Sequence, residues 1–141
     1  MIQTEYIELS TRGHTDIHDI TPEVTRLLRE SDITDGIVTL FVPGSTGGLT
    51  TIEYEPGLIK DIPEALEKIA PASAPYHHHD TWHDDNGSSH VRAALVGPSL
   101  TIPFTQKTPC LGTWQQLVFI DFDTRPRTRR LVVQIMGEEI V

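Results

Sequence analysis

Gly36-Ile37-Val38-Thr39-Leu40-Phe41-Val42 is the stretch of sequence that decides the fold. Its β-branched and aromatic side chains fit a pleated sheet, and the nearly continuous apolar run predicts a buried strand. Working outward, similar patterns predict further strands at residues 2–9, 49–54, 100–104, 116–122 and 130–136. Pro103 is expected to interrupt the strand at 100–104. We expect the last two strands to form a hairpin across a turn at 124–128.

Helices are expected between these strands. Thr21-Pro22-Glu23 has the features of a helix start, with a hydroxyl cap, a proline in the first turn and an acid near the positive end. An apolar stripe follows at helical spacing, and the helix is expected to end near Ser31. A second helix is expected at 62–69, and a short third one from Ser88 or Ser89 to Leu95. We expect residues 11–19, which include His14 and His18, and residues 55–57 to be turns.

Length and composition limit the fold class. The chain has 141 residues, which fits a single domain spanning 1–141 with one compact core. Ten glycines and ten prolines interrupt it often, which favours strands and turns over long helices. Two or three helices among about six strands predict an α+β domain with a mixed or antiparallel sheet.

The charge of the chain excludes some classes of partner. A net charge of −9 argues against non-specific binding to nucleic acid or to an anionic membrane surface. No apolar run approaches the roughly 20 residues of a membrane helix, and no signal-peptide pattern opens the sequence. The single cysteine, Cys110, excludes a disulfide framework within the chain and indicates a reducing compartment. We therefore expect a soluble cytoplasmic protein.

The segment from Tyr76 to His90 holds five of the seven histidines and three aspartates. Imidazole nitrogen and carboxylate oxygen are common ligands of zinc and other divalent metals, so this density predicts a metal or catalytic site. The alternative is a solvated polar loop in which the histidines have no common task.

About three of these side chains are expected to bind one ion and to leave a position open for water or substrate. His79 and His83 would share one face of a helical turn, and the Asp-Asp-Asn-Gly run predicts a turn after them. His90 would then lie in the first turn of the next helix, where the imidazole stays neutral and suits a metal. We predict His79, His83 and His90 as the ligands.

Two other segments could bind an anion. Gly44-Ser45-Thr46-Gly47-Gly48 lies between two strands, where its amides and hydroxyls could surround a phosphate; the alternative is an ordinary bulge. Ser45, Thr46 and Gly47 are the predicted contacts. The arginines at 125–130 include Arg127 and Arg129, whose guanidinium groups match phosphate oxygens or simply balance an acidic surface.

Several of these motifs together resemble those of the YjbQ family, whose members are often labelled secondary thiamine-phosphate synthases. They are Gly112-Thr113-Trp114-Gln115, the pair Asp85 and His90, and the arginine-rich end of the chain. The match covers nearly the whole chain. The resemblance implies an α+β fold that assembles as a homotrimer, with a site near the histidines completed by a neighbouring subunit.

The resemblance also implies roles for single residues. The loop histidine of the family falls on His79, its acid-plus-histidine pair on Asp85 and His90, its strand glutamate on Glu53, and its arginine on Arg127 or Arg129. Many members have His-Thr-Thr-Ala or His-Thr-Ser-Ala where this chain has Gly44-Ser45-Thr46-Gly47, so one histidine is missing at Gly44. We hypothesise that His83 or His78 replaces it.

These observations lead to one functional hypothesis and two alternatives. The resemblance implies thiamine-phosphate synthesis, in which a thiazole phosphate displaces pyrophosphate from an activated pyrimidine. A divalent metal, with zinc expected, and a small anionic or phosphorylated substrate would meet at the histidines; Asp85, Glu53, Arg127 and Arg129 would be the catalytic residues. The alternatives are a metal-dependent hydrolase of a small phosphorylated or carbonyl compound, and a non-catalytic trimeric protein that binds a metal or metabolite.

Overall fold

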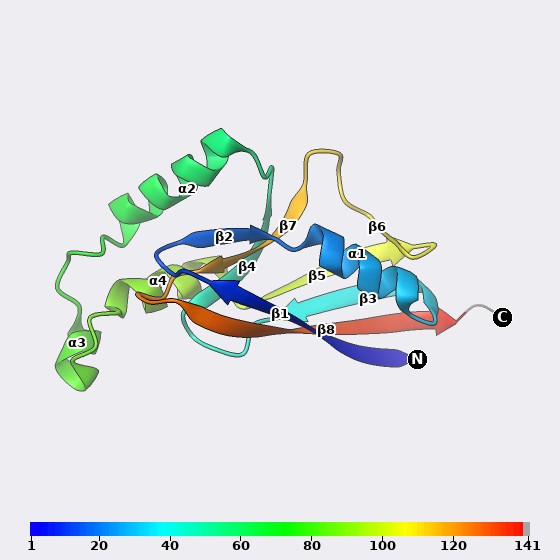
Figure 1. Cartoon of the computed structure of the whole chain (residues 1–141), viewed down its shortest axis with the longest axis horizontal. Coiled ribbons are helices and arrows are strands. Elements are labelled where there is room, and N and C mark those ends of the chain that lie inside the picture. Colours follow the sequence, from blue (N-terminus) through cyan, green and yellow to red (C-terminus); the bar gives the residue numbers. More distant parts are fainter. Residues whose placement is uncertain (140–141) are drawn as a thin grey trace.

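Two antiparallel sheets form the body of the protein, as the computed structural model shows for residues 1–139 (Figure 1). The five-stranded sheet has the order β1 (Ile2–Thr11), β8 (Arg127–Glu139), β3 (Ile33–Phe41), β5 (Ser99–Thr105) and β6 (Thr108–Pro109). The three-stranded sheet has the order β2 (Asp16–Asp19), β7 (Gln116–Asp121) and β4 (Gly47–Ile52). The predicted α+β class is confirmed, and all strand pairs are antiparallel.

Within residues 1–139 there are four helices, where two or three were expected. They are α1 (Thr21–Glu30), α2 (Pro56–Ile69), α3 (His77–Trp82) and α4 (Gly87–Val96). The stripe of α1 buries Val24, Leu27 and Leu28, and the helix ends at Ser31 as predicted. None of the described helices has the length and apolar composition needed to cross a membrane.

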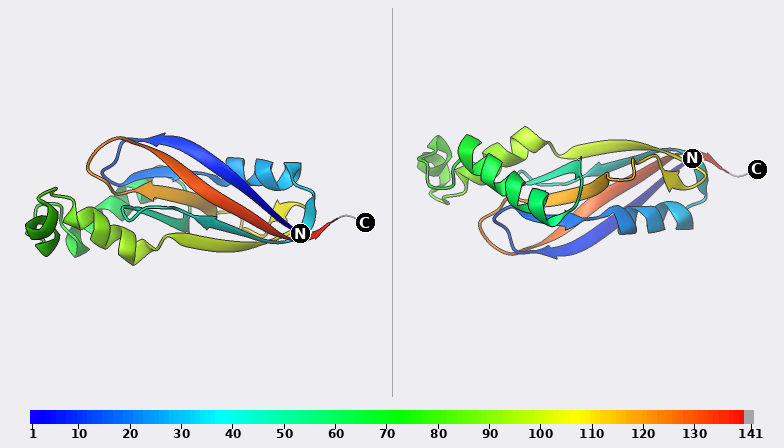
Figure 2. Two further views of the ribbon diagram at one scale, coloured as in Figure 1. Left: turned by 90° about the horizontal axis from the view of Figure 1, so that it is seen from below. Right: turned by 90° about the horizontal axis from the view of Figure 1, so that it is seen from above.

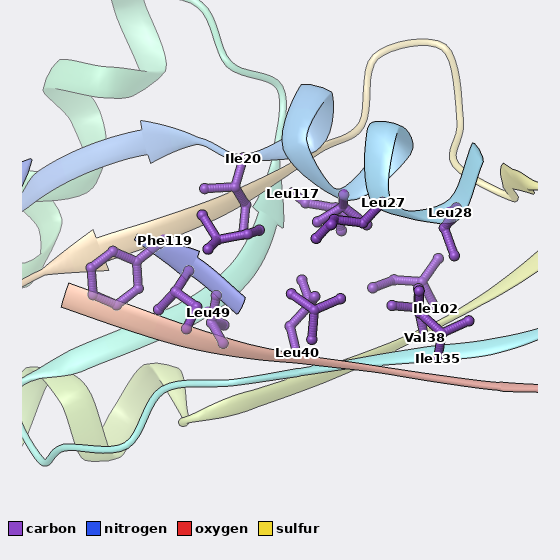
Figure 3. Close-up of a cluster of buried hydrophobic side chains, with 14 of the residues drawn as sticks. Ile20, Leu27, Leu28, Val38, Leu40, Leu49, Ile102, Leu117, Phe119 and Ile135 are labelled. Carbon is purple, nitrogen blue, oxygen red and sulfur yellow. The ribbon is translucent and has the colours of Figure 1, made fainter. Parts of the chain in front are cut away.

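The strand β7 lies at the centre of the molecule, with two apolar clusters on its two faces. Leu117 and Phe119 belong to the main core, which joins both sheets and α1 (Figure 3). Val118 and Ile120 face the opposite way, into a smaller cluster covered by α2 and α4. Because both faces are buried, nearly every residue of β7 is apolar.

Three expectations about strands are wrong. The last two strands do not form a hairpin, because β7 pairs with β2 and β4 while β8 pairs with β1 and β3. Residues 16–19 of the expected link form β2 against β7. Pro103 does not interrupt β5, since it pairs with Ile37 and its carbonyl accepts a hydrogen bond from the amide of Cys110 at 2.9 Å.

Helix starts also differ from the expectation. No side chain caps α1; the Thr21 hydroxyl instead accepts a hydrogen bond from the Leu117 amide at 2.8 Å. The expected turn at 55–57 begins α2, where the Glu55 carboxylate accepts a hydrogen bond from the Gly57 amide at 2.8 Å. The residue that precedes α4 is Asn86, so the expected caps Ser88 and Ser89 lie inside its first turn.

The arrangement places the histidine-rich segment at one end of the molecule. Helix α3 projects beyond both sheets, and the start of β1 and the end of β8 lie at the opposite end (Figure 2). No residue of α3 is buried, and α4 is the element against which it lies.

Candidate functional site at the histidine-rich end

The histidines are positioned by a short helix followed by a sharp reversal of the chain. Helix α3 ends at His83, whose amide donates to the carbonyl of His79 at 2.7 Å. His83 and Asp85 both adopt the left-handed conformation, with φ values of 56° and 54°. This conformation is uncommon for residues with a Cβ, and it turns the chain back toward α4. The predicted turn after His83 is therefore present.

One histidine–aspartate pair borders a hollow. Nδ1 of His79 lies 2.9 Å from Oδ1 of Asp85, and the His83 ring stands edge-on to His79 with centroids 5.4 Å apart. His79 and Asp85 line a hollow of about 330 Å³ together with Tyr76 and the segment Ser73–Pro75. The predicted neighbours His79 and His83 do lie together.

A second pair lies on the side of α4. Nε2 of His78 is 3.2 Å from Oδ1 of Asp84, and the rings of His78 and His90 are 4.3 Å apart. Partial burial lowers the pKa of His90 below its usual 6.5, and the nearby His78 lowers it further, against the opposite effect of Asp84. The pKa of His90 is thus lowered, which is the predicted direction, with burial and not the helix end as its main cause.

The predicted metal ligands do not form one group. His90 lies against His78, whereas His83 lies against His79. Across residues 1–139, no three His, Cys, Asp or Glu side chains are arranged to hold a metal ion together. Two close histidine–aspartate pairs, His79–Asp85 and His78–Asp84, are present instead.

The predicted anion contacts have different surroundings from one another. Ser45 is exposed. It lines a hollow of about 410 Å³ together with Gly44 and His90. The Thr46 hydroxyl is buried, accepting from Nη2 of Arg129 at 2.7 Å and donating to Oδ2 of Asp123 at 3.2 Å. Gly47 packs so closely on Phe119 that an added Cβ would lie 2.7 Å from the ring. Thr46 and Gly47 thus contribute to hydrogen bonding and packing in the protein interior.

Arg129 lies inside the protein. Its Nε and Nη2 atoms donate to the two carboxylate oxygens of Asp121 at 2.8 and 2.9 Å, and its exposed fraction is 5%. Burial alone would raise the pKa of Asp121, but hydrogen bonds from Arg129 and Thr11 outweigh it and lower the pKa. This arginine therefore holds two sheets together, since Asp121 ends β7 and Arg129 belongs to β8.

Arg127 is more accessible. Its Nη1 donates to Oδ2 of Asp123 at 2.6 Å, and its side chain is 37% exposed. Burial would raise the pKa of Asp123, but hydrogen bonds from the Thr124 amide, Arg127 and Thr46 lower it. Arg127, Arg129 and Arg130 line a hollow of about 310 Å³ with Tyr6 and Pro43.

Glu53 is separated from the other predicted residues. It follows the last residue of β4, where it is exposed, and makes no hydrogen bond or ion pair with any residue in 1–139. The strand β4 extends from Gly47 to Ile52. Glu53 therefore lies about 20 Å along the strand from the glycine loop, which is residues 44–48. Within a single chain, Glu53 does not join the histidines.

Position 44, where the family resemblance expects a histidine, faces the arginine network. A Cβ added at Gly44 would lie 3.1 Å from Nη1 of Arg129. His90 lines the same hollow as Gly44 and interacts with the backbone of Ser45. His78 packs on His90, whereas His83 packs on His79, and neither His78 nor His83 lines the hollow beside Gly44.

Sequence reasoning missed Tyr76. Its hydroxyl donates to the carbonyl of Pro71 at 2.6 Å, and its Cβ lies 2.4 Å from where a Cβ on Gly87 would be. The glycine in the Asp-Asp-Asn-Gly run is therefore needed for close packing on Tyr76 as well as for a turn. A tyrosine directly before the histidine run was the available signal.

Comparison with known proteins now identifies the family. The family model described as "UPF0047 protein YjbQ-like" matches residues 5–138. The chain belongs to this family. The resemblance found in the sequence is thereby confirmed.

Relatives of YjbQ type occur in archaea and bacteria. A UPF0047 protein of Archaeoglobus fulgidus is 37% identical over 92% of this chain and 98% of its own, and YugU of Bacillus subtilis is 31% identical over 93% and 97%. The YjbQ-like fold is also seen in a solved protein of Clostridium acetobutylicum, with a TM-score of 0.85, 32% identity and coverage of 94% and 99%. A solved Sulfolobus solfataricus relative has a TM-score of 0.87, 26% identity and coverage of 98% and 100%, and is described as of unknown function.

Proposed function

We propose that this UPF0047 protein is an enzyme in which His79 and Asp85 carry out acid–base chemistry on a small phosphorylated substrate. The observation that carries the proposal is the 2.9 Å separation of Nδ1 of His79 from the Asp85 carboxylate at the edge of a 330 Å³ hollow. The contact lacks hydrogen-bond geometry, since Nδ1 of His79 has no hydrogen-bond partner among residues 1–139. We propose that the two groups align into a hydrogen bond when substrate binds, which would fix the ring tautomer. The other nitrogen, Nε2, is then the group that takes or gives a proton.

The specific reaction that we propose is thiamine-phosphate synthesis, and the family resemblance is its main support. The ring nitrogen of a thiazole phosphate forms a bond to the methylene carbon of an activated pyrimidine, and the carbon–oxygen bond to pyrophosphate breaks. Protonated His79 would give its proton to the leaving pyrophosphate. Arg127, which is partly exposed beside the glycine loop, would neutralise phosphate charge.

The test compares two histidine variants in the same turn. His79→Gln should lower kcat/KM by about 10²- to 10⁴-fold, because it removes the proton donor and acceptor. His77→Gln is the matched control, since its side chain is fully exposed and lies 3.8 Å from Asp80. Thiazole phosphate and pyrimidine pyrophosphate are supplied together and separately. Full turnover by His79→Gln would refute the proposal.

Hydrolysis of a phosphorylated or carbonyl compound is the second candidate, since the same pair could activate a water molecule. It predicts turnover of a single organic substrate with no second one present. A protein that binds phosphate compounds but turns over none of a broad panel would instead fit the non-catalytic hypothesis.

A metal at the histidines also remains a proposal, with zinc the expected ion. The proposed acid–base chemistry involves no metal, because His79, His83 and His90 do not lie together in this structure. The experiment is elemental analysis of the untagged protein beside His79→Ala and His90→Ala. Stoichiometric zinc that both variants lose would require the two pairs to rearrange around one ion. A protein that takes up no zinc on incubation would remove the proposal.

We propose that the protein is a homotrimer, with the outer face of the five-stranded sheet as the contact surface. Three successive cross-strand rows on this face contain no charged residue, although the chain carries a net charge of −9. Their exposed or half-buried members are Ile2, Met136, Ile37, Pro103, Thr4, Gln134, Thr39, Thr101, Tyr6, Val132, Phe41 and Ser99. Uncharged, largely exposed surfaces of this kind are typical of contacts between subunits.

A further inference from the structure

A second hollow, next to the His79–Asp85 hollow, lies at the start of α4. Its volume is about 270 Å³, and Asp85 lines both hollows. Its other walls are the Gly13–Thr15 loop, the first turn of α4 and the end of α2, and its lining residues include His14, Thr15, Glu67, Ser88, Ser89, Arg92 and Thr124. None of these residues has a role in the function proposed above.

Two serine hydroxyls in this hollow lack a partner. Ser88 is 6% exposed and Ser89 is 1% exposed, yet neither hydroxyl makes a hydrogen bond to any of residues 1–139. Neither Oγ is one of the fully buried, unpartnered side-chain atoms of residues 1–139, so both hydroxyls open into the hollow. Two adjacent hydroxyls without a protein partner are therefore available to donate to a ligand that carries acceptors.

The backbone around these serines favours a negative ligand. Ser88 and Ser89 lie in the first turn of the ten-residue helix α4, and Asn86 provides no side-chain cap for it. The amides of a first helical turn have no partner within the helix, and the helix dipole makes that end positive. Oxyanions bind at such helix ends.

The charged groups around the hollow are already balanced. Arg92 is 7% exposed and donates to Glu67 at 2.6 Å, to the Thr15 hydroxyl at 3.0 Å and to the carbonyl of Ala70 at 3.0 Å. Asp85 is beside His79. Thr15 is held at φ 62°, a strained value for a β-branched residue, by this bond to Arg92. The site is thus built and rigid, with no free carboxylate other than the one that serves His79.

We propose that this second hollow binds the phosphate group of a small phosphate monoester, with Ser88, Ser89 and the α4 amides as its donors. Because Asp85 separates the two hollows, the rest of the same molecule then lies beside His79. The inference rests on the proposed function for its substrate, but the phosphate site itself is testable without turnover.

Inorganic phosphate is titrated into the full-length protein. Binding is measured by calorimetry and by the shifts of the backbone amide NMR signals. The largest shifts are expected at Ser88 and Ser89, and Ser88→Ala and Ser89→Ala should each weaken binding at least tenfold, since each removes a hydrogen bond to a charged group. Ser10→Ala, at an exposed serine of β1, is the matched control and should bind as the wild type does.

Arg130→Ala tests the competing arginine-lined hollow. Failure of the wild type to bind phosphate, or binding that Arg130→Ala abolishes and the serine variants leave unchanged, would overturn the inference. His79→Gln should keep phosphate binding while it loses turnover. If that variant keeps turnover while the serine variants lose phosphate, the phosphate site stands and the proposed acid–base function fails.

Discussion

Single residues in the interior, more than those on the surface, connect the two sheets to the candidate site. Arg129 binds Asp121 through both carboxylate oxygens and also holds the hydroxyl of Thr46. It thereby fixes the glycine loop against β7 and β8. Its free Nη1 faces Gly44, which is where the family histidine would lie. The sequence suggested Arg129 as a catalytic residue, and the structure supports a positioning role.

Arg129→Ala should lower the free energy of unfolding by about 3–5 kcal/mol, because it leaves the buried Asp121 carboxylate without its cation. Urea denaturation measures the change. Arg130→Ala is the matched control: Arg130 is exposed and stacks on Tyr6 at 3.7 Å, an interaction worth about 1 kcal/mol. Equal losses in the two variants would contradict the structural role.

Acid should unfold the protein through Asp121 and Asp123. Both carboxyls have pKa values in the folded state below the usual 3.8. Groups with lowered pKa values contribute stability above about pH 4 and lose it as the pH falls through their folded-state pKa. The free energy of unfolding should therefore fall as the pH drops below about 4.

Asp123→Asn should flatten this pH dependence and lower the stability at pH 7. Asp61→Asn, at an exposed position of α2, should do neither. Chemical denaturation at several pH values gives the comparison. A pH profile of Asp123→Asn that matches the wild type would exclude this carboxyl as a source of acid lability.

At the scale of elements, the close approach of β3 and β8 depends on two glycines. Gly36 and Gly137 pair directly across the strands, next to the register shift between Ile33 and Asp35. A Cβ at Gly36 would lie 2.0 Å from the carbonyl oxygen of Met136, and one at Gly137 would lie 2.0 Å from that of Asp35. Neither carbonyl can move without breaking the ladder of hydrogen bonds.

Gly36→Ala should therefore destabilise the protein by at least about 1–3 kcal/mol, the usual cost of overpacking. Gly112→Ala serves as control, because its added Cβ would have no neighbour closer than 3.7 Å. Thermal unfolding of the two variants under one condition makes the comparison. If Gly36→Ala is as stable as Gly112→Ala, the backbone of β8 shifts to accommodate the added methyl group, and the prediction is wrong.

The short helix α3 owes its place to its neighbours rather than to its own packing. None of its residues is buried, and its histidines are held by aspartates that follow the helix, at 3.2 Å for His78–Asp84 and 2.9 Å for His79–Asp85. Such an exposed element is free to rearrange when a ligand or a neighbouring subunit binds.

At the scale of the whole molecule, the uncharged sheet face and the isolated Glu53 both point to an assembly. Glu53 lies about 20 Å from the glycine loop of its own chain. If it takes part in catalysis, it must serve the site of a neighbouring subunit. In the proposed homotrimer, Glu53 is available to the site of a neighbouring subunit.

Ile37→Glu should dissociate the trimer, since it places a charge in one of the three uncharged rows. Light scattering after gel filtration should give three times the 15.8 kDa chain mass for the wild type and the single-chain mass for the variant. Leu95→Glu, at a position of α4 that is 58% exposed, should remain trimeric. A wild-type protein with the mass of one chain would refute the assembly.

The sequence predicted those elements whose signal is local. The stripe of α1 and the apolar run of β3 each identify one element, because hydrophobic periodicity reports the face that an element buries. The start of α2 was missed, since Glu55-Pro56-Gly57 suits both a turn and a capped helix start. The hairpin predicted for β7 and β8 is absent, because the partner of a strand is chosen by packing of residues far apart in the chain.

The sequence by itself determined the α+β class, the core strands and the histidine-rich segment as the place of interest, because composition and periodicity carry that information. Its motifs, in addition, carried the resemblance to the family. Only the tertiary structure decided that the histidines form two histidine–aspartate pairs, that Thr46 and Arg129 face inward, and that Ser88 and Ser89 share a hollow with Asp85. The physical reason is that hydrogen bonds and burial depend on side chains brought together from different parts of the chain: α3 and the turn after it, α4, the loop before β4, and strands β7 and β8.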